Sequence, residues 1–185
     1  TPLYSSAASD VYKRQGYSGT NGMNIDQLKK ELAEDEGCVY EVYLDHLGKK
    51  TFGIGHLVTS DDLEYNLKQG TPVTEDRVSE CFEKDIKTTV ADCLVLYEDF
   101  SLYPEEVQLI IANMMFNLGR TRLSLFKDMQ KCVKDFNWVG AADAMVDSRW
   151  YIQVPNRAER LVKRMLAAPA PEGNWNIPRI DIHGR

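Results

Sequence analysis

Apolar residues recur at helical spacing near the start of the chain, and two short runs typical of strands follow. The first apolar set falls on one face of a helix: Ile25, Leu28, Leu32 and Ala33. Asn24 and Gln27 have the spacing of a capping box, and Gly37 suits the left-handed position just beyond a helix. We therefore predict a helix over residues 24–36 that ends at Glu36.

The next stretch has the pattern of a β-hairpin. Residues 39–44 and 50–54 are predicted strands, and the turn-forming residues 45–48 lie between them. Beyond the hairpin, Leu63 and Leu67 suggest a short helical pattern that stops before Pro72.

Two longer helices are predicted after this breaker. Thr74 suits the cap of a helix over residues 75–96, whose apolar stripe is Val78, Phe82, Ile86, Thr89, Val90 and Cys93. Pro104 opens a second helix and Gly119 closes it. Because the residues between these two are almost all apolar, this helix should be buried at the centre of a lobe.

Three further helices should pack around that buried one, at residues 123–134, 138–147 and 156–166. Residues 1–22 lack periodicity and the apolar core of a secretory leader, so we expect a leader, a tag or an artefact outside the fold, at least partly disordered. Residues 168–185 contain several prolines and are expected to form an extended tail, docked by Trp175.

Composition and charge narrow the possible functions. The chain has 185 residues, of which 43% are hydrophobic and 27% charged, a composition typical of a globular protein. No apolar run approaches the length of a membrane span, so we expect no membrane insertion. The formal net charge of -6 argues against a nucleic-acid binder, which would carry a basic surface.

The cysteines and histidines do not predict a metal site. Cys81 and Cys93 lie on the apolar side of one predicted helix, where a free thiol behaves as a small hydrophobic group. We therefore expect reduced thiols rather than disulfides. No cysteine pair has ligand spacing with a histidine, and the three histidines are scattered, so no metal and no cofactor are predicted.

Three residues around the hairpin could carry acid–base chemistry. A helix C-terminus carries partial negative charge, which favours the protonated form of a carboxyl group such as that of Glu36. Asp45 and Thr51 should lie near the ends of the hairpin. An acid, a second carboxylate and a hydroxyl that holds water are what glycoside hydrolysis requires. By spacing alone, acidic residues on a solvated surface are the better explanation.

The literal sequence favours the first interpretation. Residues 35–37 (D-E-G) and 51–56 (T-F-G-I-G-H) closely resemble the signature of phage-type lysozymes, the family of the T-even bacteriophage endolysin. The resemblance implies that Glu36 is the general acid, Asp45 the second catalytic carboxylate, and Thr51 a residue beside the attacking water.

A second block, residues 148–158 (S-R-W-Y-x-Q-x-P-N-R-A), resembles the same family. It implies that Arg157 approaches the catalytic glutamate from the opposite lobe, and that Phe116, Asn117 and Arg149 line the substrate cleft. By residue type alone, Trp150 is better explained as a core aromatic than as a platform for sugars.

Asp85 needs a partner because it lies on the apolar stripe of its helix. By resemblance it matches a helix aspartate that pairs with the histidine after the hairpin, here His56. We interpret this pair as structural support of the cleft, since no nucleophile lies beside it.

The sequence departs from the family at two places in addition to its acidic charge. The stretch 56–85 is shorter than in the T-even enzymes, so we expect one helix of the small lobe to be trimmed. Ala144 stands where that family has a cleft asparagine.

The pattern and the resemblance together predict a mainly helical α+β fold of two lobes. The small lobe would span residues 23–96 and carry the hairpin and a long connecting helix, and the helical lobe would span residues 97–167. The resemblance implies a monomeric muramidase that cleaves the β-1,4 bond between N-acetylmuramic acid and N-acetylglucosamine in bacterial peptidoglycan with inversion. If phage-encoded, it would be made in the cytoplasm of the infected host before lysis.

Two alternatives remain open at this stage. The chain could be a non-catalytic protein that binds the bacterial wall, although such a protein has no need of all three candidate catalytic residues. It could also be a lysozyme domain used as an antibacterial toxin or in host defence.

Overall fold

The computed structural model describes residues 22–169 of the chain. Its helices are α2 (Ile25–Glu36), α3 (Glu75–Leu96), α4 (Glu105–Leu123), α5 (Lys127–Lys134), α6 (Trp138–Val146), α7 (Arg149–Gln153) and α8 (Pro155–Ala167). Three strands, β1 (Val39–Leu44), β2 (Lys50–Gly53) and β3 (His56–Leu57), form one antiparallel sheet, and a short 3-10 helix spans Phe100–Leu102. The predicted mainly helical α+β fold is confirmed.

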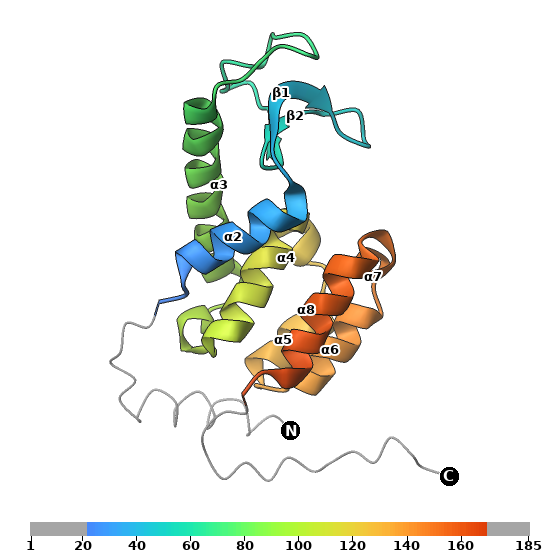
Figure 1. Ribbon diagram of the computed structural model, residues 1–185. Coiled ribbons are helices and arrows are strands. Elements are labelled where there is room, and N and C mark those ends of the chain that lie inside the picture. The colour runs from blue at the N-terminus through green and yellow to red at the C-terminus, as the bar shows by residue number, and fades with distance from the viewer. Residues whose placement is uncertain (1–21, 170–185) are drawn as a thin grey trace.

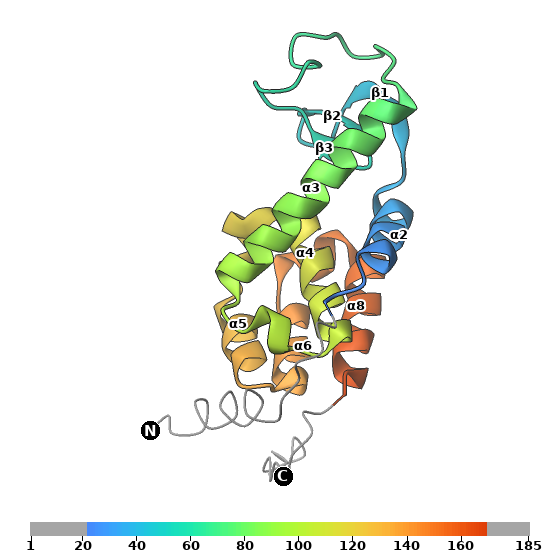
Figure 2. The same ribbon diagram turned by 90° about the vertical axis from the view of Figure 1, so that its left-hand side faces the viewer.

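The sheet lies at one end of the molecule and the helices gather at the other, with α3 running between them (Figures 1 and 2). The buried apolar side chains form two clusters, and α3 contributes to both. Phe82, Ile86 and Cys93 belong to the large cluster among the helices. The small cluster beneath the sheet consists of Val42, Phe52, Val73, Val78 and Cys81. Helix α3 therefore joins the two ends through its own packing.

Helix α2 begins and ends close to where the sequence predicts. The side chain of Asn24 accepts a hydrogen bond from the Gln27 backbone N–H at 3.0 Å, and Gly37 follows the helix with a φ of 70°. The capping-box prediction is only half correct, because the Gln27 amide donates to Glu31 instead of turning back. The Asn24 N–H donates to Glu105 Oε1 at 3.1 Å, which ties the start of α2 to α4.

The register of the sheet assigns its side chains to two faces. Tyr43 lies opposite Thr51, and Thr51 lies opposite Leu57, so these three share one face. The other face carries Phe52 and His56, whose rings are 4.9 Å apart, and packs onto the small cluster. Strand β3 has only two residues, too few for a hydrophobic pattern to predict it.

The chain between β3 and α3 returns along the free edge of β1. The Val42 N–H donates to the Thr71 carbonyl, and the Val73 N–H donates to the Tyr40 carbonyl, both at 2.9 Å. This segment, residues 58–73, therefore covers an edge that would otherwise expose unpaired backbone groups.

The short helical pattern predicted within this segment is wrong. Leu63 is 81% exposed and Leu67 is also exposed, so neither anchors a helix against a core. The segment forms successive turns, held instead by the buried carboxylates of Asp62 and Glu64. Both accept hydrogen bonds from the Arg77 guanidinium on α3, at 2.9–3.3 Å. Long-range ion pairs replace the apolar contacts that the pattern implied.

Helix α4 is the buried centre of the helical end, as its composition predicts. Its residues from Val107 to Ala112 are all buried. Gly119 interrupts the helix with a φ of 74° and a ψ of 161°, but a last turn continues to Leu123. Consequently α5 begins at Lys127, later than predicted. The sequence pattern also missed α7, whose five residues are too few to show a period.

All four cysteines are free, which agrees with the expected reduced thiols, and Cys81 and Cys93 are buried. Within residues 22–169, no helix is both long enough and apolar enough to cross a membrane. The predictions for residues 1–21 and for the tail around Trp175 lie outside the described residues.

Candidate active site

Glu36 is the last residue of α2, and its carboxyl group meets a cation from the other end of the chain. Arg157 Nη1, on α8, donates a hydrogen bond to Glu36 Oε1 at 2.6 Å. The Arg157 side chain is only 8% exposed, whereas that of Glu36 is 21% exposed. Glu36 is therefore held from one side by a buried guanidinium and keeps part of its surface open to solvent.

Two further residues hold Arg157 in this position. Asn113 Oδ1 on α4 accepts from Arg157 Nε at 2.7 Å, and the Asn113 backbone carbonyl accepts from Nη2 at 3.2 Å. Asp35 accepts from the Asn113 amide at 2.9 Å and from Arg160 at 2.6 and 2.7 Å. Asn113, Asp35 and Arg160 thus surround the Arg157–Glu36 contact with groups whose hydrogen bonds are satisfied. We call Asp35, Glu36, Asn113, Arg157 and Arg160 the carboxylate–arginine network.

The sequence motifs did not reveal the roles of Asp35, Asn113 and Arg160. One signal was available, since Asn113 is a polar residue in the middle of an almost wholly apolar helix and is completely buried. A buried amide needs partners, which marks such a position as a place where polar groups meet.

The second oxygen of Glu36 faces the turn between β2 and β3. A Cβ atom placed on Gly55 would lie 3.2 Å from Glu36 Oε2, and Gly55 has a φ of 67°. Only glycine combines this backbone conformation with so close an approach. The sequence T-F-G-I-G-H thus brings the hairpin backbone against the carboxyl group.

We expect Gly55→Ala to destabilise the protein more than Gly70→Ala. Both glycines have positive φ, so both substitutions should cost on the order of 1–3 kcal/mol in backbone strain. Nothing lies within 4 Å of the Gly70 position, whereas at Gly55 the new methyl group must displace Glu36. Urea unfolding of the two variants measures the difference, and equal losses would show that Glu36 yields without cost.

Asp45 and Thr51 lie at the two sides of the hairpin turn. Asp45 Oδ1 accepts from the backbone N–H groups of Lys49 and Leu47, both at 2.8 Å, and these bonds lower the pKa of Asp45. Thr51 is 5% exposed, and its hydroxyl donates to the Lys49 carbonyl at 3.2 Å. Asp45 is thus kept as a partly exposed carboxylate, and the Thr51 hydroxyl oxygen keeps its capacity to accept.

Tyr43 is affected by two of the candidate catalytic residues and lies opposite the third in the sheet. It lies opposite Thr51 in the sheet. Partial burial raises the pKa of Tyr43, and the nearby carboxylates of Glu36 and Asp45 raise it further. Both charges thus oppose the ionisation of one phenol. Tyr43 was not predicted as a site residue, because a tyrosine on a strand is by its type alone no sign of a functional site.

Removing the charge of Glu36 should therefore shift the titration of Tyr43. In Glu36→Gln the pKa of Tyr43 should move down toward its ordinary value, because one of the charges that oppose the phenolate is gone. The phenolate absorbance, taken as the difference from the corresponding Tyr43→Phe protein, measures this. Glu41→Gln is the matched control, since Glu41 is an exposed residue of β1 whose charge is not among those that raise the pKa of Tyr43. Equal shifts in the two variants would contradict the proximity of Glu36.

The predicted pair of His56 and Asp85 is present. His56 Nδ1 lies 2.7 Å from Asp85 Oδ2. Burial opposes a charged ring, but the carboxylates of Asp85 and Asp62 outweigh it and raise the pKa of His56. The structure also brings Cys81 to this group. His56, Asp62 and Cys81 are buried, and their ligand atoms lie within 4.8 Å of one another, so these three could hold a metal ion. Sequence spacing predicted no metal site because the three residues come from separate segments.

The three predicted substrate residues lie at the helical end. Phe116 packs edge-on against Phe82 with ring centres 6.0 Å apart. Asn117 Oδ1 accepts from the indole N–H of Trp150 at 2.8 Å. Trp150 is 3% exposed, so the interpretation of this residue as a core aromatic is confirmed.

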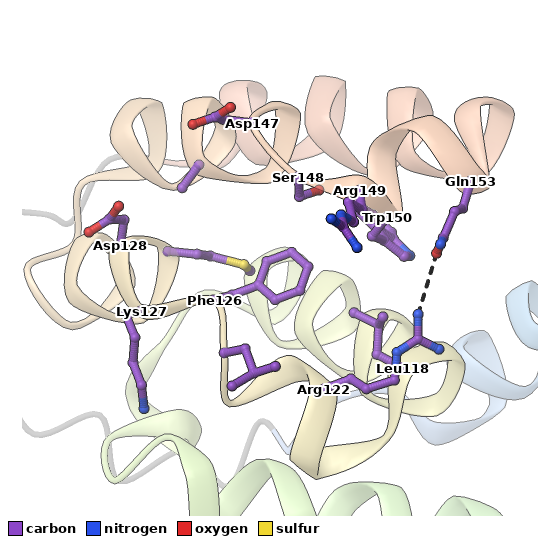
Figure 3. A pocket seen from close by; sticks show the side chains of 13 residues that line it. Leu118, Arg122, Phe126, Lys127, Asp128, Asp147, Ser148, Arg149, Trp150 and Gln153 are labelled. Atoms are coloured by element: carbon purple, nitrogen blue, oxygen red, sulfur yellow. Dashed lines mark hydrogen bonds between the residues drawn. The ribbon is translucent and has the colours of Figure 1, made fainter.

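Arg149, an exposed residue, lines a cavity of about 480 Å³ at this end of the molecule. Figure 3 shows Arg149, Trp150 and Phe126 among the residues that line this cavity, with a hydrogen bond between Arg122 and Gln153. In that bond Arg122 donates to Gln153 Oε1 at 3.3 Å. Ala144 also lines the cavity, whereas Phe116 and Asn117 do not. None of Glu36, Asp45 and Thr51 lines it, so the structure separates this cavity from the candidate catalytic residues.

Comparisons with known proteins show which proteins this chain is similar to. A family model described as phage lysozyme matches residues 33–167. The chain is 27% identical over 157 residues to "Probable T4-type lysozyme 2" of Dictyostelium discoideum, covering 75% of this chain and 92% of that protein. It is 29% identical over 160 residues to "Peptidoglycan hydrolase gp36" of Pseudomonas phage phiKMV, covering 86% of this chain but 17% of that protein.

A third relative is "Pre-baseplate central spike protein Gp5" of Enterobacteria phage T4, 29% identical over 157 residues. The alignment covers 75% of this chain and 27% of that protein. The chain thus spans almost the whole of the amoebal relative but a minor part of the two phage proteins.

Proposed function

Because the chain belongs to the phage lysozyme family, we propose that it is a muramidase that hydrolyses the β-1,4 bond between N-acetylmuramic acid and N-acetylglucosamine. The observation that carries the proposal is the Glu36 carboxyl group. It lies at a helix end, in contact with Arg157, beside a hairpin that carries Asp45 and Thr51. The family and the printed name of the phage phiKMV relative support the coarser statement that this is a lysozyme-like peptidoglycan hydrolase.

Each candidate residue has a separate role in the proposed reaction. Glu36 Oε1 is engaged by Arg157, so the proton for the leaving sugar oxygen would come from Oε2, which faces the hairpin. Asp45 remains ionised and would act as the base or stabilise the oxocarbenium-like transition state. Thr51 would accept a hydrogen bond from the attacking water. We propose inversion, in which water attacks the face opposite the leaving group.

We propose that the substrate binds between two lobes, residues 23–96 and residues 97–167. Glu36 would act from the first lobe while Arg157, from the second, holds it in place. Phe116, Asn117 and Arg149 would bind sugar or peptide groups on the helical side. His56 and Asp85 would support the hairpin end of the cleft. No cofactor takes part in the proposed chemistry, and the protein would act as a monomer.

The biological setting is a further proposal. As a phage product the protein would be synthesised in the cytoplasm of the infected host and would act at lysis. The relatives include two phage proteins and one from an amoeba, and the proposed chemistry is the same if the domain serves as a toxin or in host defence.

The experiment that tests the proposal is digestion of purified peptidoglycan with analysis of the products. Borohydride reduction of the new ends should give muramitol and not glucosaminitol, because the bond broken is that of the N-acetylmuramic acid anomeric carbon. NMR at early times should show the α-anomer if the reaction inverts. Binding without release of reducing ends would replace the proposal with the wall-binding alternative.

A further inference from the structure

A second cluster of reactive side chains lies away from Glu36, where β3, the 58–73 segment and the start of α3 meet. His56 comes from β3, Asp62 from the turn segment and Cys81 from α3, and their exposed fractions are 5%, 6% and 1%. The three offer an imidazole nitrogen, a carboxylate oxygen and a sulfur within 4.8 Å of one another. These are the ligand types that zinc prefers in proteins.

The His56 ring is fixed in an orientation that suits a ligand. Nδ1 lies 2.7 Å from Asp85 Oδ2, which leaves Nε2 to face Asp62 and Cys81. Nε2 is buried and, within the described part of the chain, makes no well-aligned hydrogen bond, although Asp62 Oδ2 is 3.3 Å away. That oxygen instead accepts from the N–H and hydroxyl of Thr59, at 2.7 and 2.9 Å. A buried, unpartnered nitrogen beside a carboxylate needs a cation or a proton.

One distance of the cluster matches a tetrahedral ion, and the distances to Cys81 Sγ are at most 4.8 Å. Ligands about 2.1 Å from zinc at the tetrahedral angle lie roughly 3.4 Å apart. His56 Nε2 and Asp62 Oδ2, at 3.3 Å, already have this separation. The contact of Asp85 with the other ring nitrogen reproduces the carboxylate–histidine–metal arrangement common around zinc.

The charge of the surroundings also favours a divalent cation. The carboxylates of Asp62, Glu64 and Asp85 belong to the elements that meet at this cluster. Arg77 supplies one positive charge through its bonds to Asp62 and Glu64. The apolar cluster beneath the sheet has only five buried residues. A small core of this kind gains much from a metal that crosslinks its segments.

We propose that His56 Nε2, a carboxylate oxygen of Asp62 and Cys81 Sγ form a structural site for a divalent transition metal ion, zinc above all. If that oxygen is Oδ2, the Thr59 hydroxyl gives up its bond to Asp62 when the metal binds. A water molecule would complete the tetrahedron. On binding, the Cys81 S–H bond breaks, its proton passes to solvent and the metal–sulfur bond forms. A proton on His56 is released in the same way. The ion would pin the 58–73 segment to α3, independently of the chemistry at Glu36.

The test is addition of Zn²⁺ or Co²⁺ to protein stripped of metal with a chelator. The protein should be a Cys38→Ala variant, because Cys38 is an exposed thiol that would bind metal by itself. Zn²⁺ should bind with one-to-one stoichiometry, release protons and raise the melting temperature by several degrees. Co²⁺ should give the thiolate charge-transfer absorbance and the intense visible bands of a tetrahedral site.

Cys81→Ala is the decisive variant and Cys93→Ala is its matched control. Both remove a buried thiol from α3, but Cys93 lies outside the cluster. The cobalt bands and the zinc stabilisation should disappear in Cys81→Ala and in Asp62→Asn, and should persist in Cys93→Ala. No binding to the parent protein, or equal binding after Cys81→Ala, would overturn the proposal. A His56 imidazolium whose NMR signals ignore Zn²⁺ would show that a proton alone fills the position.

Discussion

Glu36→Gln should lower the rate of peptidoglycan hydrolysis by about 10²–10⁴-fold, the contribution typical of a general acid. The glutamine side chain has the same shape and its oxygen still accepts from Arg157, so the contact seen at 2.6 Å can persist. What disappears is the proton that the leaving sugar oxygen requires. Release of reducing ends from purified peptidoglycan, at matched protein concentrations, measures the effect.

Glu34→Gln is the control for this substitution. Glu34 lies on the same helix two residues earlier and is exposed, so its replacement removes an equal charge away from the network. We expect this variant to retain full activity, and both variants to unfold at similar urea concentrations. If Glu36→Gln hydrolysed the wall at the parent rate, another residue would have to supply the proton. The proposed roles of Asp45 and Thr51 would then also be wrong, because both are defined relative to Glu36 as the acid.

The elements that the sequence predicted well are those specified by local signals. The capping side chain of Asn24, the glycine at position 37 and the apolar period between them determine α2 without reference to the rest of the fold. The long helix α3 has a similar cap at Thr74 and begins and ends where predicted. The hairpin of β1 and β2 has a strong turn signal between two short strands.

The segment between β3 and α3 could not be predicted because its order comes from distant partners. Asp62 and Glu64 are buried through bonds to Arg77 on the next helix, and no local pattern reveals that pairing. Leucines 63 and 67 misled the prediction, since a helical spacing over so few residues also arises by chance.

The same distinction applies to the candidate site. The motifs around Glu36 and Arg157 are specific enough to identify both residues, and the structure brings them within 2.6 Å. Asn113 and Arg160 contact Asp35 across 78 and 125 positions of sequence, so only the folded chain reveals them. A cluster such as that of His56, Asp62 and Cys81 likewise depends on the path of the segment that the pattern misassigned.

Arg157→Met should destabilise the protein by about 3–5 kcal/mol, the cost typical of removing one partner of a buried ion pair. Methionine keeps much of the aliphatic stem and removes the guanidinium. Asp35, whose side chain is 6% exposed, and the fully buried Asn113 would then lose hydrogen bonds or a countercharge that water cannot readily replace. Urea unfolding, followed by circular dichroism, measures the change.

Arg120→Met is the matched control because Arg120 also pairs with one aspartate, Asp92, but is 52% exposed. An exposed pair of this kind contributes at most about 1 kcal/mol. If Arg157→Met cost no more than this control, the network could not be a buried electrostatic unit. Adding Asp35→Asn to Arg157→Met should recover part of the lost stability, because the neutral amide no longer leaves an uncompensated charge behind. Simple additivity of the two losses would mean that Arg157 acts on Glu36 alone, and that Asp35 is paired sufficiently by Arg160.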